Sequence, residues 1–358
     1  MPSTATLAPN PVSSAKPKLW KPKRIFFTAD ALEQPFGQQI LQRVRELDLD
    51  VTELSSNRLP SLKGKDDRDT YRLAKSTLAV VNAPPSMMKL QPIPPSADWQ
   101  FHLAKGCPAH CQYCYLAGSL SGPPITRVYA NLPEVLSALA AYEKPGQLTT
   151  FEASCYTDPL SLEHLTGSLS ECVRYFGTRE GAQLRWVSKF SAVEPLLGLP
   201  HNGRTRARGS VNAEPISQRL EGGTAPVTER ISGLRQLAQD GYPIGAVIAP
   251  IMPVAGWREH YSALLDSLEE ALALHNNQTC DLTFELISHR FTPGSKEVLE
   301  GWYPNSGLEM DESERSVKRN KFGGLKYVYG KEVMSELRTF FETELAVRFP
   351  AAQVLYWT

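Results

Sequence analysis

The chain has 358 residues, 42% of them hydrophobic, and its 38 Lys and Arg residues balance its 38 Asp and Glu residues. This length permits one large domain or two ordinary ones with a real hydrophobic core. A net charge of zero excludes a globally basic nucleic-acid-binding protein, so any such surface must be a local patch. No apolar run approaches the roughly 18 residues of a bilayer-spanning helix, which predicts a protein without a membrane partner.

The first 18 residues are rich in Pro, Ser and Thr and contain lysine but no acidic residue. An organelle transit peptide is an alternative interpretation, but Arg24 is the first arginine and the prolines would break an amphipathic helix. We therefore predict a disordered tail over residues 1–18. Six cysteines are too few for a disulfide-dense secreted domain, so we expect a reducing, cytoplasmic location.

Residues 19–97 are predicted to form an N-terminal α/β extension. We expect a strand at 24–29, a helix at about 36–48, a short strand after it and a further strand at 76–84. The helix is predicted because apolar residues recur at the spacing of one helical face, at Ile40, Leu41, Val44 and Leu47.

A regular alternation of strands and helices begins at residue 98. Six strands are expected, at 98–106, 147–158, 182–190, 205–213, 243–253 and 280–288. Helices or helix-sized connectors separate them, and the clearest helices are expected at 132–143, 160–176, 227–242 and 258–275. This order predicts an α/β fold in which residues 98–300 form a partial (β/α)6 TIM-like barrel, with its chemistry at the carboxyl ends of the strands.

Residues 301–358 are predicted to be a C-terminal extension packed on the barrel. The pattern indicates a strand or hairpin arm over 325–329, a helix over 331–348 and a closing strand.

Three of the six cysteines lie within eight positions, as Cys107, Cys111 and Cys114 in a C-x3-C-x2-C pattern. Structural zinc would need four ligands, usually as two separated pairs, and His110 is badly placed to be the fourth because it adjoins Cys111. Three thiolates on a tight loop instead suit three corners of a cubane iron–sulfur cluster and leave its fourth iron open. The pattern therefore predicts a catalytic [4Fe-4S] cluster.

The cysteine spacing, on the loop after the first barrel strand, resembles the radical S-adenosylmethionine superfamily, and the aromatic Tyr113 before the third cysteine strengthens the likeness. The resemblance implies that S-adenosyl-L-methionine binds the open iron and is split reductively to a 5′-deoxyadenosyl radical. Most members carry a Gly-Gly-Glu motif after the second strand, but this chain reads "FEASCYTD" there.

That departure, together with the strings "GCPAHCQYCYLAGSL", "TRVYANL", "HNGRTRARGSVNA", "DLTFELISHRFT" and "KYVYG", resembles the spore photoproduct lyase family from about residue 22 onward. The resemblance implies a DNA repair lyase that acts on ultraviolet-damaged DNA. It would reverse the spore photoproduct, 5-thyminyl-5,6-dihydrothymine, to two thymines. A reductant such as flavodoxin or ferredoxin would supply the electron.

The same resemblance assigns roles to individual residues. Cys155 occupies the position of the hydrogen-atom donor, and Tyr113 and Tyr115 resemble the relay that quenches the resulting thiyl. The alternative for Cys155 is a small apolar residue that only packs in the core, as we expect for Cys172 and Cys280. The alternative for the two tyrosines is that their rings only pack.

Without Gly-Gly-Glu, hydroxyls and a cation must hold the amino-acid end of the cofactor. By resemblance these are Thr157, Lys189 and Ser210, with the lysine pairing with the carboxylate. A solvated lysine at the strand end is the alternative for Lys189. Thr157 departs from the serine expected at its position.

Two basic stretches are candidates for DNA contact. Arg204, Arg206 and Arg208 alternate, so a strand that contains all three would place them on one face, near anions or simply paired with Asp or Glu. The segment 316–330 interleaves basic residues with aromatics around a Gly-Gly turn, as a hairpin that extrudes a lesion would need. The predicted DNA contacts are Arg290, His289, Lys326 and Tyr327.

Two alternatives to this function stay open at the level of sequence. One is a related radical enzyme that keeps the scaffold but acts on a different substrate. The other is a non-catalytic DNA-binding protein in which a cluster or zinc is structural.

Overall fold

A computed structural model describes residues 17–119, 122–273, 280–319 and 324–358. The tail predicted over residues 1–18 therefore lies almost entirely outside the described residues. Within the described ranges, no helix is both long and apolar enough to cross a membrane.

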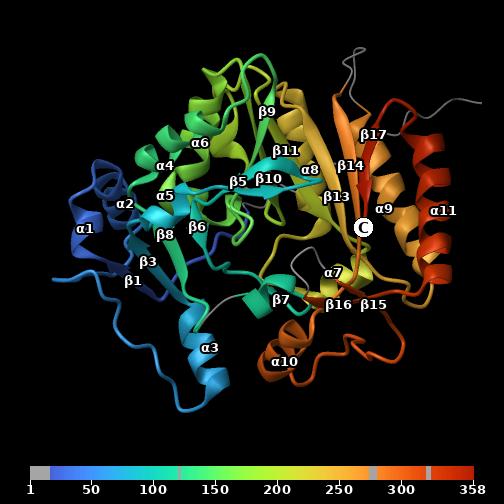
Figure 1. Cartoon of the computed structure of the whole chain (residues 1–358), viewed down its shortest axis with the longest axis horizontal. Helices are drawn as coiled ribbons and strands as arrows, with labels where there is room; N and C mark the ends of the chain where they lie inside the picture. Colours follow the sequence, from blue (N-terminus) through green and yellow to red (C-terminus); the bar gives the residue numbers. More distant parts are fainter. Residues whose placement is uncertain (1–16, 120–121, 274–279, 320–323) are drawn as a thin grey trace, which may run out of the picture.

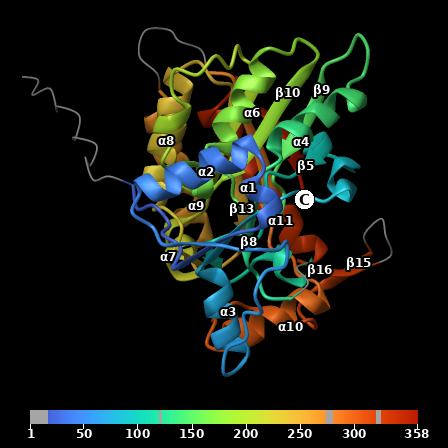
Figure 2. The same cartoon turned by 90° about the vertical axis from the view of Figure 1, so that its left-hand side faces the viewer.

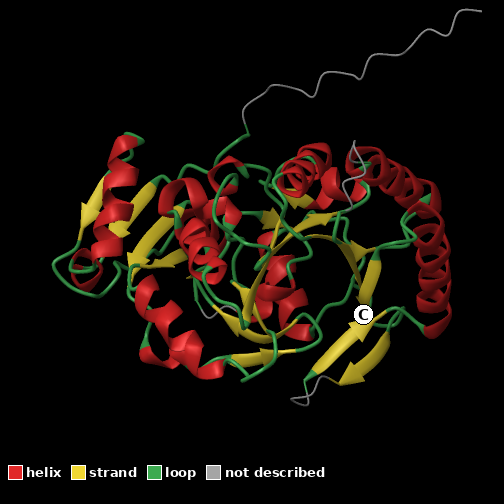
Figure 3. Cartoon of the chain, turned by 90° about the horizontal axis from the view of Figure 1, so that it is seen from above, coloured by secondary structure: helices red, strands yellow, loops and turns green. Residues whose placement is uncertain are grey.

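The main sheet has eight strands in the order β17-β14-β13-β11-β10-β9-β5-β4 and curls into an open half-barrel (Figure 3). All six predicted barrel strands are present and parallel to their sequence neighbours. They are β5 (Ala97–Phe101), β9 (Thr149–Ala153), β10 (Ala182–Ser188), β11 (Thr205–Val211), β13 (Ile244–Ile251) and β14 (Leu282–Ser288). The predicted partial barrel is confirmed.

Two further strands extend this sheet at its edges. β4 (Gln91–Ile93) pairs antiparallel with β5, and β17 (Gln353–Trp357) pairs parallel with β14. The predicted closing strand therefore belongs to the barrel sheet itself, so the C-terminal extension completes the barrel sheet as well as packing on its outside.

Helices cover the convex face of the sheet (Figure 1). The larger ones near the predicted positions are α4 (Leu132–Leu139), α6 (Ser168–Gly177), α8 (Val227–Gln239), α9 (Trp257–Leu272) and α11 (Lys331–Arg348). The helix predicted over 160–176 is divided, because Gly167 takes a left-handed φ of 67° between α5 (Glu163–Thr166) and α6. The single-turn helix η4 (Leu160–Leu162) precedes α5, and η3 (Ala140–Tyr142) follows α4.

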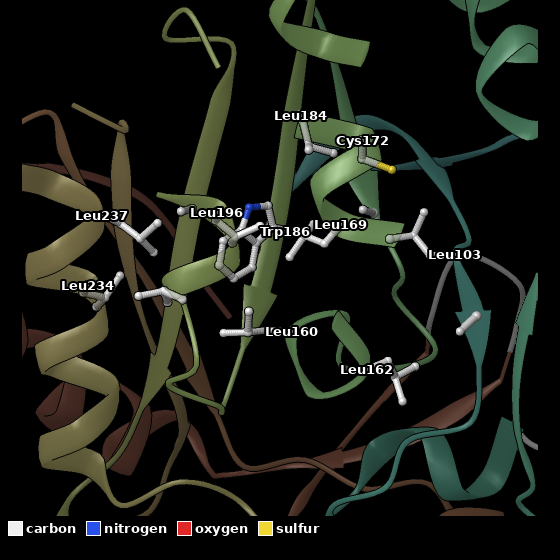
Figure 4. Close-up of a cluster of buried hydrophobic side chains, with 14 of the residues drawn as sticks. Leu103, Leu160, Leu162, Leu169, Cys172, Leu184, Trp186, Leu196, Leu234 and Leu237 are labelled. Carbon is white, nitrogen blue, oxygen red and sulfur yellow. The ribbon is translucent and has the colours of Figure 1, made fainter. Parts of the chain in front are cut away.

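Aliphatic side chains from these helices and from β10 fill the space between sheet and helices (Figure 4). Trp186 and Leu184 of β10 are essentially buried against Leu169 of α6 and Leu234 of α8. Cys172 is fully buried in the same core, as expected for a packing cysteine.

A second, smaller sheet has the order β2-β1-β3-β8-β6. Its strands are β1 (Arg24–Phe27), β2 (Val51–Glu53), β3 (Thr77–Val81), β6 (Ala104–Lys105) and β8 (Thr126–Tyr129). The helices α1 (Ala29–Leu32) and α2 (Pro35–Glu46) belong to the same part of the chain. β6 and β8 come from beyond residue 97, so the chain crosses between the sheets after that position. The strand predicted over 98–106 accordingly ends at Phe101, because Ala104 and Lys105 pair with β8 instead.

Short elements that were not predicted gather at one end of the barrel (Figures 1 and 2). The helices among them are α3 (Asp67–Lys75), α7 (Glu214–Leu220) and α10 (Pro293–Trp302), and the strands are β7 (His110–Cys111) and β12 (Glu221–Gly222). Short 3-10 turns occur at η1 (Pro85–Met88), η2 (Tyr115–Ser119) and η5 (Glu194–Leu196). The predicted hairpin is present as β15 (Ser316–Arg319) and β16 (Leu325–Val328), paired antiparallel.

Candidate active site

The loop that carries the three clustered cysteines begins at a glycine that no other residue could replace without strain. Gly106 has a φ of 89°, and a Cβ at this position would lie 2.4 Å from the carbonyl oxygen of Ile125. The amide of Gly106 donates to the carbonyl of Tyr156 at 3.0 Å. This bond ties the start of the cysteine loop to the segment that contains Cys155.

Groups from distant parts of the sequence hold the same loop. β7 pairs antiparallel with β12, with Cys111 opposite Glu221, and the amide of Gln112 donates to the carbonyl of Leu220 at 2.8 Å. The buried Lys75 of α3 donates to the carbonyls of Cys107 and Ala109. The loop is therefore fixed on two sides before any cofactor binds.

All three clustered thiols are free and lie in surroundings that favour the protonated form. Burial raises the pKa of Cys107 to about 11, and burial likewise raises the pKa of Cys111 and Cys114. Iron binds thiolates, so cluster assembly at this loop must release protons.

No three His, Cys, Asp or Glu side chains in the described ranges are arranged to share a single metal ion. A cubane cluster has no such requirement, because each cysteine ligates a different iron atom. Three free cysteines on one fixed loop fit that kind of group.

Cys155 follows β9 through a strained turn. Ser154 has a φ of 60°, an uncommon value for a residue other than glycine, and its amide donates to Phe101 at 2.8 Å. Its hydroxyl accepts from the amide of Leu103 at 3.0 Å. Burial, with a further contribution from Glu152, raises the pKa of Cys155, so its sulfur keeps its hydrogen at neutral pH.

The register between β10 and β11 brings two of the predicted cofactor residues together. Ser188 lies opposite Gly209, so Lys189 and Ser210 follow side by side, and the lysine Nζ is 2.9 Å from the serine Oγ. Nζ also donates to the carbonyl of Ala249 at 3.0 Å. The lysine is therefore held inside the site, which does not agree with a solvated strand-end side chain.

Thr157, the third predicted cofactor residue, has a buried hydroxyl without a hydrogen-bond partner among the residues that the structure describes. Its neighbour Asp158 accepts from the amide of Lys189 and the hydroxyl of Ser188, each at 2.7 Å, which brings the ends of β9 and β10 together. A buried polar atom without a partner calls for an explanation, and a ligand that supplies the missing contact is one. The donor set thus fits a small molecule with an amino-acid end.

Glu221 is a site residue that sequence reasoning missed. Its fully buried carboxylate accepts from Lys189 Nζ at 2.8 Å, from Arg230 at 2.6 Å and from the phenol of Tyr113. Burial opposes ionisation, but the charges of Lys189 and Arg230 hold the pKa of Glu221 at about 2. The only signal in the sequence is an acid before two glycines at 221–223, which no spacing rule singles out.

The two predicted relay tyrosines have different surroundings. Tyr113 is buried and bonded to Glu221, whereas Tyr115 is 37% exposed. The guanidinium of Arg290, a predicted DNA contact, lies 5.4 Å from the centre of the Tyr115 ring. Tyr115 therefore faces the surface on which a large substrate could rest.

The hairpin supplies the remaining basic residues of this surface. Burial lowers the pKa of Lys326, and the nearby charges of Arg290 and Lys318 lower it further, so both of these cations lie within electrostatic range of Lys326. Tyr327 stacks on Phe291 with ring centres 5.1 Å apart and pairs with it through the backbone. These contacts attach the hairpin to the body of the protein.

His289 has the least support among the predicted DNA contacts. It is 2% exposed, and burial with the charge of Arg315 lowers its pKa to about 3. A buried, neutral imidazole offers no charge to a phosphate.

The alternating arginines are explained by ion pairs. Arg206 pairs with Asp281 at 2.7 Å, and Arg208 is 2% exposed and pairs with Glu285 at 2.8 Å and with Glu152. Arg204 precedes β11, so the three do not share one strand face. Of the two interpretations left open, pairing with acidic residues holds for Arg206 and Arg208.

Comparison with known proteins gives a consistent result. A family model for spore photoproduct lyase matches residues 20–358. The spore photoproduct lyase of Bacillus subtilis (strain 168) is 37% identical over 340 residues, which cover 94% of this chain and 98% of that protein. The one from Geobacillus sp. (strain Y412MC61) is 38% identical over 344 residues, covering 95% and 100%.

Solved structures of spore photoproduct lyase are similar along almost the whole chain. A mutant with bound AdoMet and dinucleoside spore photoproduct matches with a TM-score of 0.90 and 35% identity, over 95% of this chain and 100% of that one. A complex with dinucleoside spore photoproduct matches with a TM-score of 0.89 at the same identity and coverage. The similarity thus includes the barrel sheet, the smaller sheet and the C-terminal segments.

Proposed function

Because the chain belongs to the spore photoproduct lyase family, we propose that it reverses the spore photoproduct in ultraviolet-damaged DNA to two thymines. The enzyme is a radical S-adenosylmethionine lyase that uses a [4Fe-4S] cluster and S-adenosyl-L-methionine. One observation carries the proposal. The three-cysteine loop, Lys189 and the buried, unpaired hydroxyl of Thr157 meet beside Cys155 at one end of the barrel.

Cys107, Cys111 and Cys114 would hold the cluster, and Thr157 and Ser210 would hold the cofactor's amino-acid end. When bound, these groups supply one electron and a 5′-deoxyadenosyl radical that removes a hydrogen atom from the lesion.

Lys189 would pair with the cofactor's carboxylate. Its ammonium is held inside the site by Ser210 and Ala249, so its place is set before the cofactor arrives.

Cys155 is the proposed hydrogen-atom donor to the thymine radical that remains after the methylene bridge breaks. One S–H bond breaks and one C–H bond forms, which leaves a sulfur-centred radical on Cys155. The raised pKa supports this role, because a thiolate has no hydrogen to give. Tyr115 and Tyr113 would then pass a hydrogen atom from 5′-deoxyadenosine to the sulfur, so that each phenol regains the hydrogen atom that it gives.

The DNA face is proposed to consist of Arg290 and Lys326, with Tyr327 anchoring the hairpin that carries the lysine. The lesion must leave the helix to reach a half-buried thiol, and a crosslinked dimer that pairs poorly costs less to flip than two normal bases. Tyr115, which is exposed and lies beside Arg290, would line the path of such a base. His289 would contribute by shaping this region, because it is buried and neutral.

We further propose that a small electron carrier such as flavodoxin or ferredoxin reduces the cluster, and that the protein works in the cytoplasm. Six free cysteines agree with a reducing compartment.

The decisive experiment is turnover of authentic dinucleoside spore photoproduct by anaerobically reconstituted enzyme with dithionite and S-adenosyl-L-methionine. We expect two thymidines from each lesion. Cleavage of the cofactor with an untouched lesion would mean that the enzyme acts on a different substrate. No cofactor cleavage at all would favour a non-catalytic protein.

A further inference from the structure

Four side chains contact the two carboxylate oxygens of Glu221. This residue is not among those predicted to bind cofactor or substrate. Oε1 accepts from Lys189 Nζ at 2.8 Å and from the phenol of Tyr113. Oε2 lies 2.6 Å from a guanidinium nitrogen of Arg230 and 3.0 Å from the hydroxyl of Ser217. One oxygen atom therefore joins the lysine proposed for the cofactor to the tyrosine proposed for the relay.

The backbone of Glu221 is joined to the same site. It lies opposite Cys111 in the β7–β12 pair, so the strand that presents its carboxylate also supports the cysteine loop. Glu221 thus contacts the cysteine loop through its backbone and the lysine and the tyrosine through its carboxylate.

Lys189 makes three hydrogen bonds within the protein, and its ammonium would meet the cofactor's carboxylate as a positive charge. The acceptors are Ser210 Oγ, the carbonyl oxygen of Ala249 and Glu221 Oε1, and the last is the only charged one. Without that carboxylate, a long and flexible side chain would keep two neutral acceptors and be deprived of its strongest one. Its ammonium would then be placed less narrowly for the carboxylate of an incoming ligand.

The positive charge of Arg230 helps to keep the Glu221 carboxylate ionised, and Arg230 also has other hydrogen-bond acceptors. Its side chain is 1% exposed and also donates to Ala225 O at 2.7 Å, Thr224 Oγ1 at 2.8 Å and Ser210 O at 3.0 Å. A change at Glu221 therefore leaves the buried arginine with several acceptors, which makes the substitution testable in a folded protein.

We propose that Glu221 is a positioning residue that fixes the Lys189 ammonium for the cofactor's carboxylate and orients the Tyr113 phenol through the same oxygen atom. This inference rests on the proposed function, because it takes Lys189 as the residue that meets S-adenosyl-L-methionine.

The test is Glu221→Gln in the reconstituted holoenzyme, which keeps the size of the side chain and one acceptor oxygen but removes the charge. We expect unchanged iron content and a Kd for S-adenosyl-L-methionine about tenfold higher, as is usual when a group that orients a ligand-binding residue is removed. Binding of 5′-methylthioadenosine, which lacks the amino-acid end, should be the same as in the wild type. A merely structural role would not produce this selectivity.

Glu214→Gln is the matched control, because it removes the same charge from an exposed position at the start of α7. It should leave both Kd values unchanged. The proposal is overturned if Glu221→Gln binds S-adenosyl-L-methionine as tightly as the wild type or more tightly, or if its affinity for both ligands falls equally.

Should Glu221→Gln yield no folded holoenzyme, Glu221→Asp replaces it. The aspartate keeps the negative charge near Arg230, but its side chain is one methylene shorter and reaches less far towards Lys189. We therefore expect the same selective weakening of S-adenosyl-L-methionine binding, and its absence overturns the proposal. Failure of the proposed function is a separate result: the wild type itself would then leave dinucleoside spore photoproduct unrepaired.

Discussion

Three local features set the position and the protonation state of the Cys155 thiol. The left-handed backbone of Ser154, which costs roughly 1–2 kcal/mol, turns the chain out of β9 just before it. The amide of Gly106 binds the carbonyl of Tyr156 just after it. Burial keeps the thiol protonated. The residue is therefore placed and kept in the chemical form that hydrogen-atom donation needs.

Replacing Cys155 by Ala should leave cleavage of S-adenosyl-L-methionine intact, because Cys155 is not among the residues expected to hold the cluster or the cofactor. Repair should instead end in side products, since the thymine radical no longer has its donor. Product analysis of dinucleoside spore photoproduct by chromatography measures this, and clean repair to two thymidines would refute the assignment.

Replacing any one of Cys107, Cys111 or Cys114 by Ala should abolish cluster assembly, because each thiolate is expected to hold its own iron atom. The measurements are iron content and visible absorbance after anaerobic reconstitution. Cys172→Ala is the matched control, since that thiol is buried in the core between sheet and helices. Full iron in a loop variant would end the cluster interpretation.

Among the elements, the hairpin β15–β16 is the one that we propose for contact with DNA. Every residue of β15 is exposed, and Lys318 pairs across the hairpin with Lys326. Two like charges directly opposite one another are unfavourable on their own and are relieved by a bound anion. The stacking of Tyr327 on Phe291 keeps this arm attached beside Arg290.

The double substitution Lys318→Gln with Lys326→Gln should weaken binding to duplex DNA that contains the lesion. It should also reduce the slope of log K against log salt concentration by about one for each phosphate that the hairpin no longer neutralises. Cofactor binding should not change. Binding isotherms at several salt concentrations measure the effect. Arg338→Gln, which removes a charge from an exposed ion pair of α11, is the control. An unchanged salt slope in the double variant would remove the hairpin from the DNA interface.

At the scale of the whole molecule, a buried ionic network connects the strands of the half-barrel. Arg208 binds Glu152 of β9 and Glu285 of β14, and Glu285 also accepts from Arg185 at 2.6 Å and from the hydroxyl of Tyr356 at 2.6 Å. Tyr356 belongs to β17, so the C-terminal strand is joined to the interior by this network. The network spans the sheet from β9 to its edge at β17.

Arg208→Ala should lower the free energy of unfolding by about 3–5 kcal/mol, because it leaves two buried carboxylates with fewer partners. Denaturant unfolding of the apoprotein measures this. Arg45→Ala is the comparison, since the exposed pair of Arg45 with Glu53 should contribute less than about 1 kcal/mol. Equal effects of the two substitutions would contradict the role of the network.

Much of the fold could be predicted because its signals are local. The six barrel strands alternate with helices or helix-sized connectors over short distances, and Cys107, Cys111 and Cys114 lie on one short loop. The short elements α3, α7 and α10 are each at most ten residues long, and contacts with distant parts of the chain, such as those of Lys75 in α3 with the cysteine loop, position them. The exit of the chain from the barrel at Phe101 also depended on a partner, β8, that lies further along the sequence.

The sequence by itself determined the type of chemistry, because cysteine spacing and the residues after each strand are properties of a linear pattern. Only the tertiary structure decided that Arg208 is used inside the barrel, that His289 is buried and that Glu221 joins Lys189 to Tyr113. The physical reason is that pairing and burial of charges depend on which strands and loops become neighbours. Positions far apart in the chain, such as 113, 189 and 221, meet only when the sheet closes around them.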